Sequence, residues 1–181
     1  MLKQYNETLS VEASEVAMTA NGISPQGTKN EAHDHQRCID DALTAAERVC
    51  KERGARLTPL RRRVLELVWE SHRPAAAYAL LDALKPDHSA AAPPTIYRAL
   101  DFLLENGLVH RVQTLNAFVG CDAPEHAHRG FFVICEDCGD AAELEVPALD
   151  SAVTEPAAKQ GFTVHARTLE ATGLCHHCQS A

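Results

Sequence analysis

The chain has 181 residues, of which 45% are hydrophobic, and this length and composition suit one or two folded domains and exclude a disordered protein. No apolar run of about 18 residues is present and the N-terminus lacks the apolar core of a signal peptide. We therefore expect a cytoplasmic protein that does not enter a membrane. The net charge of −8 argues against nucleic acid as a partner of the chain as a whole.

The charge is distributed unevenly along the chain. Residues 41–115 carry 11 basic and 9 acidic side chains, whereas residues 116–181 carry 3 basic and 10 acidic ones. Only the middle segment can approach DNA phosphates, where each contact exchanges a condensed counterion for lysine or arginine. The distribution is weak support for DNA binding by that segment.

The first half of the chain predicts a tail followed by helices. Residues 1–38 have scattered apolar positions and small polar residues, which are typical of a mobile tail. Apolar residues then recur at helical spacing. Capping and terminating residues predict four helices: from Ile39 to Gly54, from Thr58-Pro59 onward, over 78–84, and from Pro93 to Asn106-Gly107.

Two short strands are expected directly after these helices, over residues 108–113 and 118–121. Helices followed by a two-stranded hairpin make a winged helix-turn-helix, a DNA-binding arrangement whose hairpin is the wing. The remaining chain predicts a strand over 131–134, a strand over 142–146, a helix over 147–160 broken near Pro156, and a strand over 162–169. A unit of this size needs a metal, a dimer interface or both for stability.

Four of the seven cysteines form two C-x2-C pairs, Cys135 with Cys138 and Cys175 with Cys178. Each pair presents two thiolates from one tight turn, and the two pairs together complete the tetrahedral sulfur shell that zinc prefers. Since protein atoms fill all four positions, we expect a structural zinc ion. Two redox motifs are the alternative; a zinc deaminase is poorly supported, because its H-x-E and P-C-x2-C elements are absent from the sequence.

His110 and Cys121 lie on the two predicted wing strands. If the hairpin turns between Leu115 and Asn116, the two residues oppose each other with Cβ atoms about 5 Å apart, which suits one metal ion. An ordinary strand histidine and a half-buried thiol are the alternative. Three further side chains can complete a tetrahedral shell from across the domain junction: His126, His128 and Glu143.

A metal held in this way would link the two predicted domains. His110 and Cys121 belong to the winged-helix part, whereas Glu143 belongs to the C-terminal unit. In a dimer, the angle between the domains sets the separation of the two recognition helices, so metal binding could switch DNA affinity on. A site with a thiolate and imidazoles suits zinc better than a site of imidazoles and carboxylates alone.

The sequences RLTP at residues 56–59 and PPTIYRAL at residues 93–100, together with the two C-x2-C pairs, resemble the ferric uptake regulator family, and most closely its zinc uptake regulator branch. The resemblance covers about residues 42–178. It implies homodimeric, metal-activated repressors that bind palindromic operators. It also implies four regulatory ligands, at His110, Cys121, His128 and Glu143, with His126 as the alternative to His128. The implied DNA contacts are Tyr78, Thr95, Tyr97 and Arg98.

The sequence thus predicts an α+β protein: a winged helix-turn-helix domain over residues 39–121, a hinge over 122–130, and an α/β dimerisation domain with a structural zinc site over 131–181. We predict a zinc-responsive repressor of zinc uptake genes, not an enzyme, with one structural and one regulatory zinc ion per chain. It binds double-stranded operator DNA as one homodimer or as two adjacent dimers, which Asp82 and Lys85 would pair by the same resemblance. An iron- or peroxide-responsive regulator is the alternative, but a Cys121 thiolate beside iron would be prone to oxidation.

Overall fold

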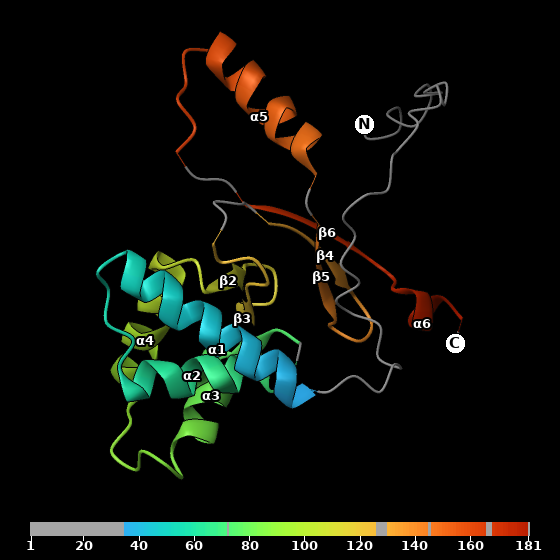
Figure 1. Cartoon of the computed structure of the whole chain (residues 1–181). Helices are drawn as coiled ribbons and strands as arrows, with labels where there is room; N and C mark the ends of the chain where they lie inside the picture. Colours follow the sequence, from blue (N-terminus) through green and yellow to red (C-terminus); the bar gives the residue numbers. More distant parts are fainter. Residues whose placement is uncertain (1–34, 72, 126–129, 145, 166–167, 181) are drawn as a thin grey trace.

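A computed structural model describes residues 35–71, 73–125, 130–144, 146–165 and 168–180. The first part holds four helices and a small sheet (Figure 1). Its elements are α1 (His35–Glu52), α2 (Pro59–Trp69), β1 (Ala75–Ala76), α3 (Ala77–Leu84), α4 (Pro93–Glu105), β2 (Val109–Val112) and β3 (Ala117–Gly120). None of the helices in the described parts is long and apolar enough to cross a membrane.

The start of α2 and the ends of α1 and α4 lie where capping residues predict them. The Thr58 hydroxyl accepts a hydrogen bond from the Arg61 amide at the start of α2. Gly54 and Gly107 adopt φ values of +64° and +65° after α1 and α4, a conformation that glycine takes without strain. Helix α1 starts at His35, four residues before the predicted Ile39. Apolar side chains of all four helices form one core.

The wing is a three-stranded sheet in the order β1-β3-β2, with antiparallel pairing throughout. Strand β1 was not predicted, because two alanines give no periodic signal. The predicted hairpin register is wrong by two residues: His110 pairs with Val119, not with Cys121. The turn lies one residue earlier than predicted, with the Asn116 amide donating to the Gln113 carbonyl at 3.0 Å.

A shift of two residues leaves every side chain on its original face of the strand. His110 and Cys121 therefore still point to the same face of the wing, as diagonal rather than direct neighbours. Val109 and Phe118 occupy the opposite face and join the helical core.

The C-terminal part contains a second three-stranded sheet, in the order β5-β4-β6. Its elements are β4 (Phe131–Cys135), β5 (Ala141–Leu144), α5 (Pro147–Lys159), β6 (Leu169–Gly173) and a short α6 (His176–Gln179). The last strand is parallel to β4 and lies at 169–173, so the prediction of a strand over 162–169 is wrong. Helix α5 continues through Pro156, where a break was expected, and ends at Lys159.

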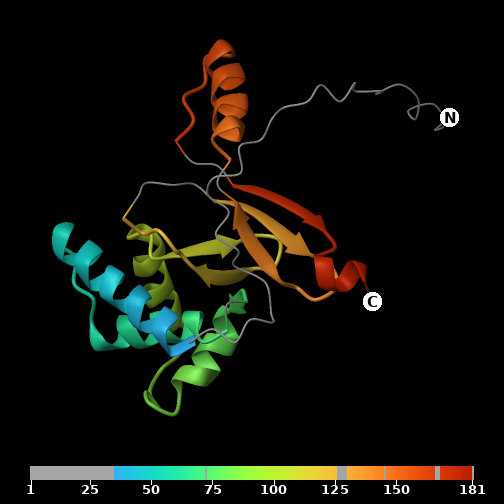
Figure 2. The same ribbon diagram turned by 45° about the vertical axis from the view of Figure 1, so that its right-hand side comes forward.

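The wing lies between the helices and the C-terminal sheet (Figure 2). A small apolar cluster joins the two sheets: Val112, Phe132, Ile134 and Ala141 are buried in it, and Val119 packs against them. The wing thus contacts the helical core with one face and the C-terminal domain with the other. Any change in how the domains sit must alter this second contact.

The wing packs tightly against the helices at Gly120. A Cβ atom at this position would lie 2.2 Å from the Trp69 ring, whereas one at Gly173 would meet nothing within 4 Å. We predict that Gly120→Ala lowers the free energy of unfolding by about 1–3 kcal/mol, because the ring must shift out of a packed core. Trp69 is the sole tryptophan, so its fluorescence during urea unfolding measures the effect directly. Gly173→Ala is the matched control, and an equal loss in both variants would contradict the prediction.

Candidate metal centres and nucleic-acid interface

The two C-x2-C pairs meet because β4 and β6 are parallel and end at the same edge of their sheet. Cys135 closes β4, while Cys175 follows the end of β6 by two residues. The Sγ atoms of all four cysteines lie within 4.8 Å of one another. Cys138 Sγ and Cys175 Sγ are 3.8 Å apart, which is roughly the edge of a tetrahedron with 2.3 Å zinc–sulfur bonds. The four side chains therefore fit a zinc ion.

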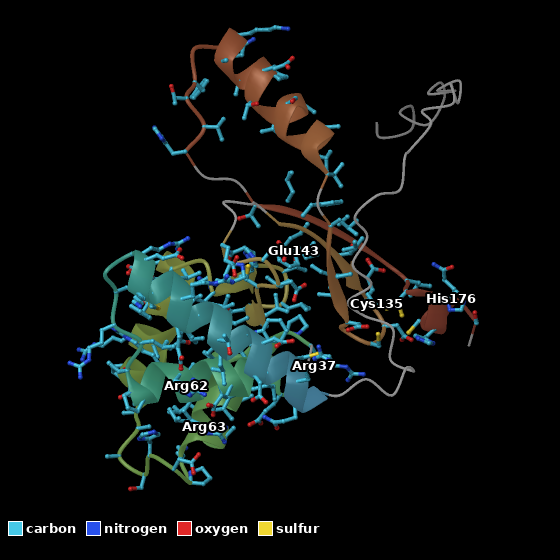
Figure 3. The ribbon with its side chains drawn as sticks, viewed as in Figure 1. Arg37, Arg62, Arg63, Cys135, Glu143 and His176 are labelled. Atoms are coloured by element: carbon cyan, nitrogen blue, oxygen red, sulfur yellow. The ribbon has the colours of Figure 1, made fainter. Side chains whose placement is uncertain are left out.

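Backbone amides near the cluster favour the thiolate form of Cys135, which is the form that binds a metal cation. Amide groups of Cys138 and Cys175 point at the Cys135 sulfur and lower its pKa to about 6. The pKa of Cys178 is raised, and the largest cause is its hydrogen bond with the Asp137 side chain. Four thiolates at these separations repel one another strongly, so a divalent cation is needed to hold them together. Cys135 and the neighbouring His176 lie at the end of the sheet remote from Glu143 (Figure 3).

A second group of candidate ligands lies at the contact between the wing and the C-terminal sheet. His110 Nε2 on β2 is 3.4 Å from Glu143 Oε1 on β5, and both side chains are largely buried. Glu143 fits here because Gly130 has no side chain; a Cβ at Gly130 would lie 2.2 Å from the Glu143 carboxylate. Cys121 follows β3 and is 3% exposed.

The Cys121 thiol is protonated at neutral pH. Burial raises its pKa to about 12, and the negative charge of Glu143 adds to this effect. A metal that binds the sulfur must therefore displace a proton.

The predicted regulatory ligands are only partly brought together. His110 and Glu143 are in contact, and Cys121 lies on the same face of the wing as His110. His126 and His128 lie outside the described residues. Within the described part of the chain, the four cysteines are the only set of three or more potential ligands that all lie within 4.8 Å.

The chain leaves the first domain at a fixed point. Arg53, at the end of α1, donates to the Asn106 carbonyl at 2.6 Å and to the Pro124 carbonyl at 3.4 Å. Arg48 forms an ion pair with Glu125. The segment after Cys121 is thereby tied to the region of α1 as far as Glu125.

The predicted DNA-contacting residues are at the starts of two helices. Tyr78, in the first turn of α3, is 63% exposed, and Tyr97, near the start of α4, is 40% exposed. Arg98 follows on the exposed side of α4, whereas Thr95 is half-buried and its hydroxyl accepts from the Ala92 amide. An exposed tyrosine and arginine at a helix start are suited to phosphate and base-edge contacts.

The basic run 61–63 is held by partners within the domain. Arg61 lies 3.6 Å from the centre of the Phe102 ring. Arg62 pairs with Glu47 and Glu66, and Arg63 pairs with Glu66, Glu70 and Asp87 (Figure 3). These arginines therefore connect helices and a loop, and we assign them no base contact.

One residue that the sequence did not single out also contacts the wing. The Glu170 carboxylate on β6 accepts hydrogen bonds from the amides of Gln113 and Thr114 in the turn of the wing. The sequence prediction ended the last strand at residue 169, so it assigned Glu170 no strand position. No periodic or spacing signal pointed to it.

Comparisons with known proteins agree with this architecture. The model of the ferric uptake regulator family matches residues 52–172. The zinc uptake regulation protein of Escherichia coli K12 is 42% identical over 141 residues, which are 76% of this chain and 81% of that protein. The peroxide-responsive repressor PerR of Staphylococcus saprophyticus is 30% identical over 149 residues, covering 82% of this chain and 95% of that one.

Two solved structures have the same fold. A zinc uptake regulator complexed with zinc and DNA gives a TM-score of 0.76 at 39% identity, over 78% of this chain and 95% of that chain. The holo form of XcZur gives a TM-score of 0.73 at 45% identity, over 78% and 99% of the two chains. A winged helix joined to a sheet domain with a cysteine cluster defines a transcription regulator rather than an enzyme. The chain belongs to the ferric uptake regulator family.

Loss of one cysteine should disrupt the four-sulfur site. We predict that Cys138→Ser lowers the zinc content by one ion per chain and destabilises the C-terminal sheet, because three thiolates cannot fill a tetrahedral shell. Metal analysis by mass spectrometry and sedimentation velocity measure the two effects. Cys38→Ser, in α1, is the control and should change neither. A Cys138→Ser protein that lacks this one zinc ion and is still a stable dimer would exclude a structural role for the site.

Proposed function

We propose that this chain is a zinc-responsive transcriptional repressor that binds palindromic operator DNA as a homodimer when its regulatory site is filled, and so controls zinc uptake genes in the cytoplasm. The observation that carries the proposal is the contact between His110 and Glu143, which joins the two domains, with Cys121 on the same face of the wing as His110. Its support is the 42% identity to the zinc uptake regulation protein of E. coli.

Two zinc ions per chain follow from the two groups of ligands. The four cysteines are complete by themselves and hold β4 and β6 together, which is a structural role. His110, Cys121 and Glu143 need a fourth ligand, for which we propose His128, with His126 as the alternative. A zinc ion bound there would be coordinated by residues of both domains at once.

The proposed switch acts through the angle between the domains. His110 and Cys121 move with the wing and its helices, whereas Glu143 moves with the C-terminal sheet. Joint ligation by these residues holds one angle, and in a dimer that angle fixes the spacing of the two α4 helices. Operator half-sites are recognised only when this spacing matches the DNA repeat. Without ligation the chain samples other angles and binds operator DNA less tightly.

Four residues would contact the operator. We propose that Arg98, near the start of α4, hydrogen-bonds to a guanine edge or to a phosphate, with Thr95 and Tyr97 beside it. Tyr78, in α3, would contact the DNA backbone. All except Thr95 are exposed. Asp82 in α3 forms an ion pair at 2.7 Å with Lys85, which directly follows the helix, and both side chains are exposed. We propose that they exchange partners with an adjacent dimer when two dimers share an operator.

A second copy of the chain would cover the exposed apolar surface of the C-terminal domain. Helix α5 stands apart from the rest of the fold (Figure 1), and none of its side chains that the structure describes is fully buried. Phe162 and Leu174 are 71% and 50% exposed. The family resemblance implies a homodimer, and burial of this surface between two protomers would stabilise a domain too small to be stable alone.

A peroxide- or iron-responsive regulator of the same family is the second candidate. The PerR relative shares 30% identity with this chain. Cys121 favours zinc, because a thiolate bound to iron is open to oxidation.

The sensing role of Cys121 can be measured separately from the structural site. We predict that wild-type chain binds operator DNA tightly only above a threshold of buffered free zinc, and that Cys121→Ser loses this response while remaining dimeric with the four-cysteine zinc in place. The reason is that serine replaces the soft ligand. Fluorescence anisotropy of labelled operator DNA gives the affinity, and Cys38→Ser is the control.

Two outcomes would overturn the proposed function. If the chain binds operator DNA equally well with and without zinc, it does not sense zinc. If only iron changes its affinity for DNA, the iron- or peroxide-responsive regulator is favoured instead.

The role of Arg98 can be tested in the zinc-bound protein. We predict that Arg98→Ala weakens operator binding by about 1–3 kcal/mol, because a bidentate contact to a base or phosphate is lost. Lys51→Ala removes a basic side chain from the exposed end of α1 and should have a small effect. Electrophoretic mobility shifts with the operator and with an unrelated duplex separate base reading from phosphate binding. Equal affinity of Arg98→Ala and wild type would exclude the assignment.

A further inference from the structure

Three side chains form a row across the C-terminal sheet and face the wing. Glu143 on β5 and Glu170 on β6 are both paired with Phe132 on the central strand β4. Residues paired in this way project to the same face of a sheet. Phe132 is buried in the cluster between the two sheets, which identifies that face as the one against the wing.

Each member of the row makes a different contact with the wing. Glu143 approaches His110, and the Phe132 ring lies 5.6 Å from the His110 ring, centre to centre. Glu170 reaches the turn at the tip of the wing. The first two contacts belong to the proposed zinc site and its surroundings, whereas the third is remote from them in the wing.

The Glu170 contact is specific in its geometry. One carboxylate oxygen accepts from the Gln113 amide at 2.6 Å, and the other accepts from the Thr114 amide at 2.8 Å and from the Thr114 hydroxyl. Consecutive amides that both donate to one anion form a strong binding site for a carboxylate. Partial burial raises the pKa of Glu170, but the hydrogen bonds from Thr114 and Gln113 outweigh it and lower the pKa below its ordinary value.

The position of Glu170 is set by the cysteine cluster. Strand β6 runs from Leu169 to Gly173, and Cys175 follows two residues after its end. The Glu136 amide donates to the Gly173 carbonyl at 2.9 Å, which joins the first cysteine turn to the end of β6. The cluster therefore holds the strand that presents Glu170 to the wing.

We propose that Glu170 is a positioning residue that fastens the tip of the wing to the C-terminal sheet in the arrangement that binds DNA. The contact requires no ligand of the regulatory site, so it favours this arrangement before zinc binds there. The Glu170 contact therefore lowers the zinc concentration at which the chain binds its operator, because less of the free energy of zinc binding is needed to hold the domains in this arrangement. This rests on the proposed function for the link between domain angle and DNA binding.

The test compares Glu170→Ala and Glu170→Gln with wild type in operator-binding titrations against buffered free zinc. We expect the zinc midpoint for Glu170→Ala to rise about tenfold, the lower end of what hydrogen bonds to a charged group contribute, with tight binding restored at saturating zinc. Glu170→Gln is nearly isosteric and keeps one acceptor oxygen, so it should shift less. Glu52→Gln removes an exposed carboxylate at the end of α1 and should leave the midpoint unchanged.

Two further readouts separate positioning from general stability. Hydrogen exchange of the Gln113 and Thr114 amides should be faster in Glu170→Ala than in wild type at equal zinc. A double-mutant cycle with Thr114→Val should show coupling, since both substitutions remove the same contact. The zinc content of the cysteine site and the dimer should be unaffected.

The outcomes distinguish this proposal from the proposed function. If wild type responds to zinc but Glu170→Ala has the same midpoint and the same amide exchange, the role of Glu170 is excluded. If wild type itself does not respond to zinc, the proposed function fails, and unchanged exchange of the Gln113 and Thr114 amides in Glu170→Ala then excludes the contact as well.

Discussion

The parallel pairing of β4 with β6 is the constraint on which the rest of the C-terminal domain depends. It carries two distant cysteine pairs to the same edge of the sheet, where four sulfur atoms come within 4.8 Å of one another. The same pairing aligns Glu170 with Phe132, and through β5 with Glu143. One strand register thus produces both the four-cysteine site at the end of the sheet and the row of side chains that meets the wing on its face.

The wing is the shared element of the two domains. Its inner face packs on the helices, closely enough at Gly120 to leave no room for a methyl group beside Trp69. Among the described residues, its outer face makes a small apolar cluster and a few polar contacts with the C-terminal sheet. The contact with the helical core is extensive, whereas the contact with the C-terminal sheet is small. The wing can therefore move together with the helices and change its contacts with the sheet. The proposed metal ligands lie in this small contact rather than in either core, so metal binding there would affect the angle between the domains most strongly.

Sequence reasoning succeeded where a local rule applied and failed where a distant partner decided. The cysteine pairs, the caps at Thr58 and Gly54, and the helical stripes could be read from spacing alone. The hairpin register was wrong by two, because Asn116 takes a positive φ of 47° and moves the turn; the even shift nevertheless kept His110 and Cys121 on one face. The last strand was placed too early, since Phe162 and Val164 have high strand propensity. The observed strand is defined by its pairing with β4, which no local pattern reveals.

The central claim is that ligation across the domain contact selects one angle between the domains. The most direct measurement is the distance between the two DNA-binding domains of the dimer, by pulsed electron paramagnetic resonance with a genetically encoded spin label at the exposed position 90. We predict a broad distance distribution when only the four-cysteine site holds zinc. We predict a single narrow distribution when the regulatory site is also filled, and no narrowing in Cys121→Ser. Distributions that are identical with and without regulatory zinc, or that narrow equally in Cys121→Ser, would contradict this claim.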